Sequence, residues 1–413
     1  MSNIIEKLKL QTSHYIKWVV GYFLLLFGAI WACINWFSMQ EYWAAFDFLI
    51  WDAKHVYSIV HDGYNSSTCA FFPLFPYFWK ILQLSPTLIS GLNFFIFVTA
   101  AVILFKHYSA TKMEVLLGIG FPSLLFMILP YSEALLYLIS VLFLLALNRK
   151  NLNLAVLMLF LMSLTKPTVA VFLPAIFLVE YLNSDQLQYK FRQLTFSLVA
   201  VLTGNFLVFW IQKQATGNWF DFFQAQSDWG NRLRWPEFPL STWSAPQVIW
   251  IDAFAFWVCM FSTALLIYFF LLKFKSDKSI SRALGYSLIY LAGTGWFVLF
   301  FRGGSLFSLN RFVLATPFVW TAMIELKRMQ FGMNHRKLIW VGAVSFFVVS
   351  LIFGSFLHIK TLLLYLLLDS LVVSWLVGFF NLKYVRVAWF VVPILVAIQI
   401  FYALVLLKGG WLA

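Results

Sequence analysis

Residues 46–76 read FDFLIWDAKHVYSIVHDGYNSSTCAFFPLFP, and they are the least membrane-like segment in the first third of the chain. They lie between an apolar run that ends near Phe37 and another that begins near Leu88. At about 100° per residue, the apolar side chains between Phe46 and Val60 fall on one arc of an α-helix and the polar ones on the opposite arc. The pattern predicts an amphipathic helix that lies flat on a membrane surface.

The polar arc of this helix gathers three ionisable side chains. Asp52, His55 and Asp62 lie within roughly 80° of one another on the helical wheel, so two carboxylates and an imidazole are expected to face the same space. An amphipathic interfacial helix also needs a polar face, and that plainer interpretation stays open. We expect Gly63 to end the helix and the FFPLFP at 71–76 to form a stiff aromatic loop, because its two prolines interrupt helical hydrogen bonding.

Composition places the chain in the membrane. Of its 413 residues 62% are hydrophobic, 11% are charged and 48 are phenylalanine. Apolar runs of about 18 to 20 residues recur, which predicts a polytopic membrane protein without a cleavable signal peptide. Three scattered cysteines are too few for a disulfide framework or a metal cluster. The chain has no P-loop and no glycine-rich nucleotide motif.

Charged residues between apolar runs mark the expected ends of the membrane-spanning helices. We place about 13 membrane helices in an all-α bundle that forms a single membrane domain over residues 1–413. The predicted spans are 18–37, 88–105, 114–129, 134–148, 152–165, 168–182, 194–212, 249–272, 284–301, 312–326, 338–357, 361–380 and 387–407.

The distribution of Lys and Arg predicts the orientation of these spans. With the N-terminus inside, 19 of the 29 Lys and Arg residues fall in inside segments. The formal net charge of +13 is therefore a topology signal that requires no nucleic acid. The two long loops, 38–87 and 213–248, are then expected on the outer face.

Several charged side chains sit where these outer segments meet the spans. Glu133 follows a tight Pro-Tyr-Ser turn, Lys166 precedes a proline, and Arg302 and Arg311 bracket a Gly- and Ser-rich turn. Ionisable groups at such positions are costly unless they face a cavity or a partner. A helix-start carboxylate, a snorkelling lysine and arginines that contact headgroups are the plainer alternatives. The aromatic loop after 213 suits either sugar binding or a membrane interface.

Five segments in order resemble a known family. They are FLIWDAKHVYSIVHDGY with AFFPLFP, then PYSEALLYL, TKPT, QAQSDWG and SLNRFVLATPF, which together span residues 46–318. They resemble the PIG-V family, or GPI mannosyltransferase II family, and its bacterial relatives in the GT-C class of membrane glycosyltransferases. The resemblance implies a GT-C-like fold and transfer of mannose or another hexose from a polyprenyl-phosphate donor, without a cofactor.

The resemblance also implies a set of site residues. Asp52 would be the catalytic aspartate. Our own hypothesis for the mechanism is that Asp52 acts as a base, takes a proton from an acceptor hydroxyl and gives inversion at the sugar carbon. Lys166 departs from the family pattern, where we expect an arginine, and a lysine lacks the bidentate grip on phosphate. Metal dependence stays open, since Asp52, His55 and Asp62 together offer ligands for a cation, but we do not favour it because their spacing fits no standard ligand set. The substrate-binding residues would be Trp51, His55, Asp62, Tyr131, Glu133, Lys166, Gln226, Trp229, Arg302 and Arg311.

Two other classes of protein remain open. A transporter or flippase of lipid-linked saccharides would share the cavity and the cations, but such proteins more often show interrupted helices in two matching halves, which the sequence does not reveal. An inactive assembly subunit would keep the spans without needing the charged set. The expected partners are a lipid-linked sugar phosphate, an unidentified acceptor and membrane lipids. We expect a bacterial plasma membrane, with the N-terminus cytoplasmic and the site facing outward, although an ER membrane would give the same topology.

Overall fold

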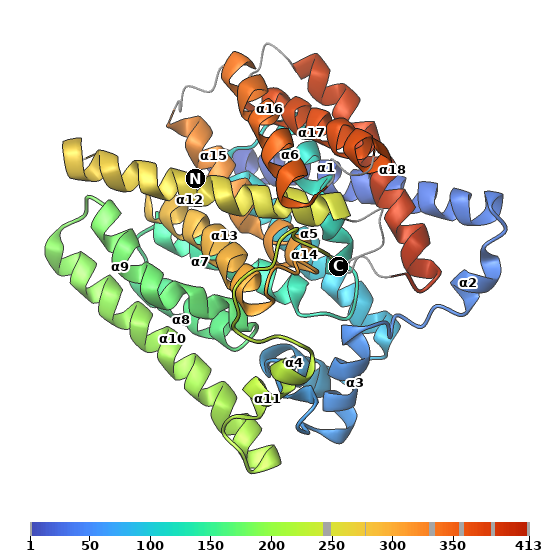
Figure 1. Cartoon of the computed structure of the whole chain (residues 1–413), viewed down its shortest axis with the longest axis horizontal. Coiled ribbons are helices and arrows are strands. Elements are labelled where there is room, and N and C mark those ends of the chain that lie inside the picture. The colour runs from blue at the N-terminus through green and yellow to red at the C-terminus, as the bar shows by residue number, and fades with distance from the viewer. Residues whose placement is uncertain are drawn as a thin grey trace.

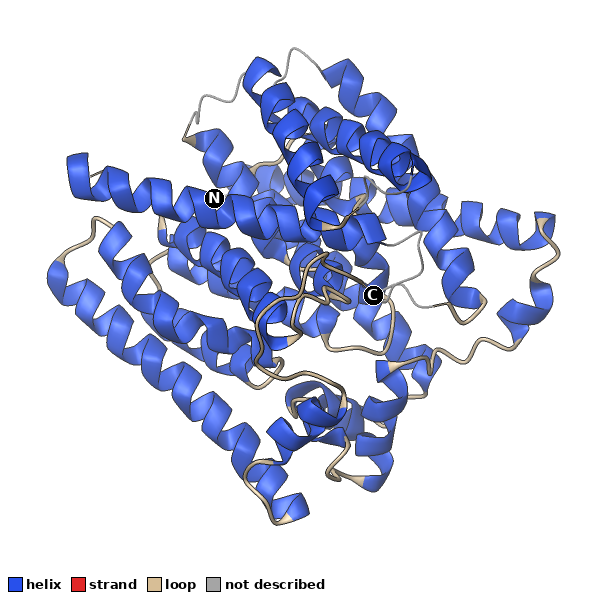
Figure 2. Ribbon diagram, in the orientation of Figure 1, coloured by secondary structure: helices blue, strands red, loops and turns tan. Residues whose placement is uncertain are grey.

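The computed structural model describes residues 2–242, 249–276, 278–329, 335–354, 359–380 and 385–410. Within these ranges the chain forms α-helices and short 3-10 turns, and no β-strand (Figure 2). Seven helices are long and apolar enough to cross a membrane, namely Thr12–Trp36, Pro86–Tyr108, Leu187–Thr216, Ile251–Ser276, Arg282–Phe301, Leu362–Phe380 and Trp389–Leu407. This confirms the prediction of an all-α, multi-pass membrane protein.

The labelled elements follow the order of the chain. They are α1 Ser2–Trp36, α2 Gln40–Ala44, α3 Asp52–Asp62, η1 Thr68–Ala70, α4 Leu74–Leu82, α5 Pro86–Tyr108, α6 Lys112–Ile119, η2 Pro122–Met127, α7 Glu133–Asn148, α8 Leu152–Ser163, η3 Pro167–Val171, α9 Phe172–Leu182, α10 Leu187–Thr216, α11 Asp221–Asp228, α12 Ile249–Ser276, α13 Arg282–Phe301, α14 Leu309–Leu314, α15 Pro317–Arg328, α16 His335–Ile352, α17 Ile359–Phe380 and α18 Val385–Leu407. The end of the predicted span 338–357 and the end of the predicted loop 213–248 lie outside the described residues.

Two predicted spans are not continuous helices. The span 114–129 is divided into α6 and η2 at Gly120-Phe121, and the span 312–326 is divided into α14 and α15 at Ala315-Thr316. In both cases a proline begins the second piece, and the residue before a proline is pushed out of the helical region. The two broken segments pack against each other, and Ser123 Oγ donates to Asn310 Oδ1 at 3.0 Å between them.

Side chains from other helices satisfy the backbone that the first break exposes. Gln399 of α18 donates from Nε2 to the carbonyls of Ile119, at 3.1 Å, and Phe121, at 3.0 Å. Its Oε1 accepts from the Tyr22 hydroxyl of α1 at 2.5 Å. Unpaired carbonyls are costly inside a membrane, so these bonds permit a break among packed helices. Asn93 of α5 plays the same part in the turn after η2, where its Nδ2 donates to the carbonyls of Leu129 and Tyr131.

Helix order brings distant segments to one end of the bundle. Figure 1 shows α10 running along one side beside α8 and α9, with α16, α17 and α18 on the opposite side. The short elements α3, α4 and α11 form a separate group at one end. Contacts link α3 to α4 and η1, and link α11 to η1 and α10. This group of short elements is met by the start of α7, the end of α8, the end of α13 and by α14. The candidate site lies where these segments meet the group.

The first predicted helix begins later than expected. It begins at Asp52, because Phe48 and Trp51 have φ values of +63° and +49°, outside the helical region. Asp47 Oδ1 accepts from the Leu49 amide at 2.9 Å, and the Tyr131 hydroxyl donates to the Ile50 carbonyl at 3.1 Å, which fixes the turn. The prediction that Gly63 ends the helix is confirmed, since it is the C-cap at φ +85°.

The predicted FFPLFP loop is also wrong in its second half. Helix α4 begins at Leu74, directly after Pro73, and contains Pro76. The first amides of a helix have no helical partner, so prolines at its start remove no hydrogen bond. Phe75 and Trp79 of α4 are buried against Val56 and Val60 of α3, which packs the two short helices together.

Candidate functional site

A cavity of about 440 Å³ opens where these segments meet. Its walls come from α3, the loop before α4, the α8–η3 turn, α11 with the loop after it, the end of α13 and α14. Polar groups lie among many aromatic rings. The lining includes Trp51, Asp52, His55, Phe71, Phe72, Lys166, Thr168, Phe222, Gln226, Trp229, Asn231, Arg234, Phe297, Phe301, Arg302, Phe307, Ser308, Arg311 and Phe312.

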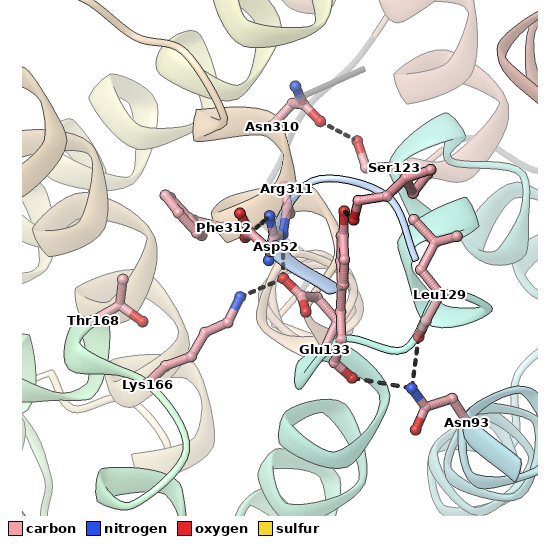
Figure 3. A network of polar contacts seen from close by, with 12 residues as sticks. Asp52, Asn93, Ser123, Leu129, Glu133, Lys166, Thr168, Asn310, Arg311 and Phe312 are labelled. Atoms are coloured by element: carbon pink, nitrogen blue, oxygen red, sulfur yellow. Dashed lines mark hydrogen bonds and ion pairs between the residues drawn. The ribbon is translucent and has the colours of Figure 1, made fainter. Parts of the chain in front are cut away.

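Arg311 connects the two carboxylates of the site (Figure 3). Its Nη1 donates to Asp52 Oδ2 at 2.6 Å, and its Nε donates to Glu133 Oε1. The guanidinium also lies over the Tyr131 ring, 4.4 Å from the ring centre. Burial lowers the pKa of Arg311, but the charges of Glu133 and Asp52 outweigh burial and raise it above its usual value. The guanidinium therefore stays charged and fixes the position of Asp52.

Lys166 forms the second cationic contact with Glu133. Its Nζ lies 2.5 Å from Glu133 Oε1 and 4.9 Å from the centre of the Phe312 ring. The Glu133 side chain is 1% exposed and that of Lys166 is 9% exposed. Burial lowers the pKa of Lys166, while the Glu133 carboxylate opposes this shift. Asp52 and Glu133 thus balance Arg311 and Lys166, two charges against two.

Arg302 is a further cation on the wall, and its hydrogen bonds are to neutral groups. It donates from Nε to Asn231 Oδ1 at 3.0 Å and from Nη1 to the Phe307 carbonyl. Asn231 donates in turn to Gln226 Oε1 at 2.7 Å, which fixes the amide. Burial lowers the pKa of Arg302 to about 10, although Asp252 and Asp52 oppose the shift.

Arg234 lies beside Arg302 and adds to the same charge. It donates from Nη2 to the Arg302 carbonyl at 3.0 Å, and Gly303 leaves room for it, since a Cβ there would lie 2.1 Å from Arg234 Nε. Within the described ranges neither arginine forms an ion pair with a carboxylate. Arg302 and Arg234 therefore stand at the cavity without a carboxylate in direct contact among the described residues.

Aromatic rings form the wall next to Asp52. His55 follows Asp52 by one turn of α3 and stacks on Phe71, with ring centres 5.5 Å apart. Trp229 lies 5.5 Å from His55 and 5.4 Å from Phe71. Ring faces beside a carboxylate and the Gln226 amide suit the apolar face and the hydroxyls of a sugar.

Two strained residues precede the main charged groups. Trp51, with φ +49°, stands directly before Asp52, and Ser308, with φ +65°, directly before α14, which carries Arg311. Such conformations cost about 1–3 kcal/mol each in non-glycine residues and persist where surrounding contacts enforce them. Asp252 supplies one such contact. It is fully buried and accepts from the Asn310 amide at 2.9 Å and from Asn310 Nδ2 at 2.7 Å.

The structure brings together most of the side chains predicted for the site. Tyr131 and Glu133 are buried behind the wall, in contact with Arg311, and do not line the cavity. Asp62 is placed elsewhere: it is exposed and accepts from Ser58 Oγ at 3.4 Å. Ten residues of helix separate it from Asp52, about 15 Å along the axis, although the wheel superimposes the two. The predicted residues that line the cavity are Trp51, Asp52, His55, Lys166, Gln226, Trp229, Arg302 and Arg311.

Sequence reasoning missed three polar residues of the site. Asn231 directly follows the QAQSDWG segment, and Arg234 lies three residues further along the chain. Their closeness to a segment already assigned to the site was the available sequence signal. No sequence signal points to Asp252, which lies in an apolar helix far from every motif. Among the residues that the structure describes, no three His, Cys, Asp or Glu side chains are grouped to hold a metal ion.

No protein-family model, curated protein or solved structure matches the chain. The family resemblance therefore remains a prediction from the sequence.

Proposed function

We propose that this protein is a glycosyltransferase that moves a sugar, mannose or another hexose, from a polyprenyl-phosphate donor to an acceptor hydroxyl. The observation that carries the proposal is the unbalanced charge of the cavity. Asp52 and Glu133 match Lys166 and Arg311, whereas Arg302 and Arg234 have no carboxylate partner among the described residues. Arg302 is partly buried in the wall and Arg234 is exposed beside it. A cleft lined by one sign of charge attracts the opposite sign, so an anionic substrate is expected.

The charge also fits the reaction. A polyprenyl-phosphate sugar is a phosphodiester with one negative charge, and loss of the sugar leaves a phosphate monoester with a second one. Cations that are already fixed in place stabilise charge that develops in the transition state. Arg302 and Arg234 supply positive charge at the cavity wall that stabilises this second negative charge. Neither arginine first has to break an ion pair among the described residues.

Asp52 is the proposed base. Its Oδ2 accepts from Arg311, which leaves Oδ1 for the proton of the acceptor hydroxyl. The acceptor oxygen then bonds to the sugar carbon on the face opposite the phosphate, and the electrons of the breaking carbon–oxygen bond go to the phosphate. The sugar is transferred with inversion. No metal is assigned a role.

The apolar wall suits the lipid part of the donor. Phe297 and Phe301 of α13 line the cavity, and Phe297 is 38% exposed at the outer surface of the helix. An isoprenoid could pass between such side chains into the membrane while its phosphate stays at the cations. By the distribution of Lys and Arg in the sequence, we propose that this cavity faces outward across a bacterial plasma membrane.

The test is a transfer assay on purified protein with polyprenyl-phosphate mannose, glucose and arabinose in parallel. We expect one donor to be consumed by the native protein and not by Asp52→Asn. Asp62→Asn is the matched control, because it lies in the same helix and outside the cavity. Turnover by Asp52→Asn at the native rate would refute the role of Asp52, and no turnover of any donor would refute the enzyme.

A transporter of lipid-linked saccharides is the second candidate, and one observation favours it. The structure contains two interrupted helical segments, α6–η2 and α14–α15, in contact with each other. Transporters often build substrate sites from interrupted helices. Movement of a fluorescent lipid-linked sugar across vesicles that contain the protein, without consumption of any donor, would favour this candidate.

A further inference from the structure

Asp369 lies near the middle of α17, inside an apolar window. It is the only charged residue of Leu362–Phe380, one of the seven helices suited to cross a membrane. A carboxylate at this depth is costly, and such residues usually face a partner or a hydrated space. Asp369 forms no hydrogen bond or ion pair with any residue in the described ranges.

Asp369 lines a small cavity of about 50 Å³ between α12, α16 and α17. Tyr365 lines the same cavity one helical turn earlier; it is 4% exposed, and its hydroxyl has no hydrogen-bond partner. Ser345 of α16 also faces the cavity and donates to the Val341 carbonyl, which leaves its oxygen lone pairs available. Asp369, Tyr365 and Ser345 therefore line one cavity, and within the described ranges neither the Asp369 carboxylate nor the Tyr365 hydroxyl has a hydrogen-bond partner.

Helices α16 and α17 approach each other closely beside Asp369. A Cβ on Gly342 of α16 would lie 2.2 Å from Val373 Cγ2 and 3.4 Å from Asp369 Oδ2. Phe254 and Trp257 of α12 stack with their ring centres 6.3 Å apart and form the opposite wall. Aromatic faces attract cations and repel anions.

We infer that this cavity is an intramembrane site for a monovalent cation, either Na⁺ or a proton carried on Asp369. One positive charge neutralises the single carboxylate, whereas a divalent ion would leave a net charge among apolar helices. A cavity of about 50 Å³ holds a small ion with one or two waters and is too small for an organic cation. Tyr365 and Ser345 are the hydroxyl-bearing side chains on the wall of this cavity.

The charged surroundings of the site are limited. Among the described residues, Tyr365 is the other titratable side chain on its wall. Asp252, at the start of α12, acts electrostatically on Tyr365 from outside the wall, and its oxygens accept from Asn310 and Thr242. A bound cation would therefore compensate the negative charge of Asp369. This inference does not depend on the proposed glycosyltransferase activity.

The test measures the unfolding temperature of the purified full chain in detergent by tryptophan fluorescence. Sodium chloride is compared with choline chloride of equal ionic strength at mildly alkaline pH. We expect Na⁺ to raise the Tm by about 2–4 °C at tenfold excess over its dissociation constant. Asp369→Asn should abolish this rise and Tyr365→Phe should reduce it. Ser370→Ala is the matched control, since its hydroxyl bonds to the Leu366 carbonyl on the exposed side of α17.

A second arm separates the two ions. If sodium has no effect but the native protein is more stable at mildly acidic than at alkaline pH, and Asp369→Asn removes that difference, the cation is a proton. If Asp369→Asn does not fold, Tyr365→Phe, which removes only one oxygen, takes its place in both arms. A Tm that depends on neither ion, or that depends on them equally in native protein and variants, overturns the site.

Discussion

Arg311 Nη1 lies 2.6 Å from Asp52 Oδ2, although 259 residues separate the two in the sequence. The same guanidinium reaches Glu133, so one side chain connects α3, α7 and α14. This contact depends on a planar group with donors in fixed directions, which a lysine does not have. Arg311 therefore determines where the proposed base stands relative to the cavity.

The substitution Arg311→Lys should separate charge from geometry. A lysine can reach Asp52 or Glu133 but does not hold both, so the base should shift from its position. Misplacement of a catalytic group by about 1 Å lowers the rate by about 100-fold. We expect kcat for sugar transfer to fall by about that factor, measured with the donor that the native protein consumes. Arg232→Lys, an exposed arginine in the loop after α11, should change nothing. A native rate in Arg311→Lys would contradict the proposed position of the base.

Glu133→Gln should destabilise the fold. The Glu133 carboxylate is buried and neutralises Lys166 and part of the charge of Arg311. Removal of one partner from a buried ion pair costs about 3–5 kcal/mol, because the remaining charges lack compensation. We expect a clear fall in the free energy of unfolding, measured by denaturant titration in detergent. Glu237→Gln, in an exposed loop, provides the control. Equal stability of the two variants would show that Glu133 has no such role.

Arg302→Gln should reduce binding of the donor more than stability. Arg302 forms no ion pair with a carboxylate of the described chain, so its loss leaves no carboxylate without a partner. Loss of a charged hydrogen bond to phosphate, about 1.5–3 kcal/mol, corresponds to a tenfold to 100-fold weaker affinity. Equilibrium binding of a polyprenyl phosphate would measure this loss, with Arg232→Gln as the control. Unchanged affinity would remove Arg302 from the phosphate site.

Gln399→Leu should lower stability because it removes the partner of two buried carbonyls. Ile119 and Phe121 would each retain an unpaired carbonyl, at a cost of about 1–3 kcal/mol per group. We expect the Tm to fall by several degrees. Thr203→Val removes a hydroxyl that bonds to a carbonyl within exposed α10 and should leave the Tm unchanged. If the two variants behave alike, Gln399 does not stabilise the break.

Chelation of divalent metals should leave the transfer rate unchanged. Lys166, Arg302 and Arg311 provide positive charge around the cavity, and we assign no step to a metal. The measurement compares transfer after dialysis against a chelator with transfer after addition of magnesium or manganese. A rate that falls on chelation and returns with either metal would contradict this assignment.

Hydropathy located several of the long helices, because apolar length is a property of each segment alone, whereas the count of about 13 membrane helices stays a prediction. The helices α5, α7 and α10 contain the predicted spans 88–105, 134–148 and 194–212 in full. The breaks at Gly120-Phe121 and Ala315-Thr316 were missed, since both lie in apolar runs and only the prolines that follow mark them. Whether a proline bends a helix or begins a new one depends on the side chains that satisfy the freed backbone, and those come from distant helices.

The site was predicted in composition but not in arrangement. A helical wheel places residues by angle and ignores distance along the axis, which explains the error at Asp62. The resemblance identified Arg302 and Arg311 as site residues, but their different surroundings depend on Glu133, Asn231 and Asp252, which only tertiary structure brings near. The turn at Trp51 depends on the Tyr131 hydroxyl, a contact over 81 residues.

The bonds of Gln399 have a consequence for biosynthesis. The chain is synthesised from its N-terminus, and Gln399 follows Ile119 by 280 residues. Until α18 emerges from the ribosome and enters the bilayer, the break between α6 and η2 lacks the two hydrogen bonds that Gln399 Nε2 donates. A chain that stops before Gln399 should therefore keep two unpaired carbonyls in an open seam between α6 and η2.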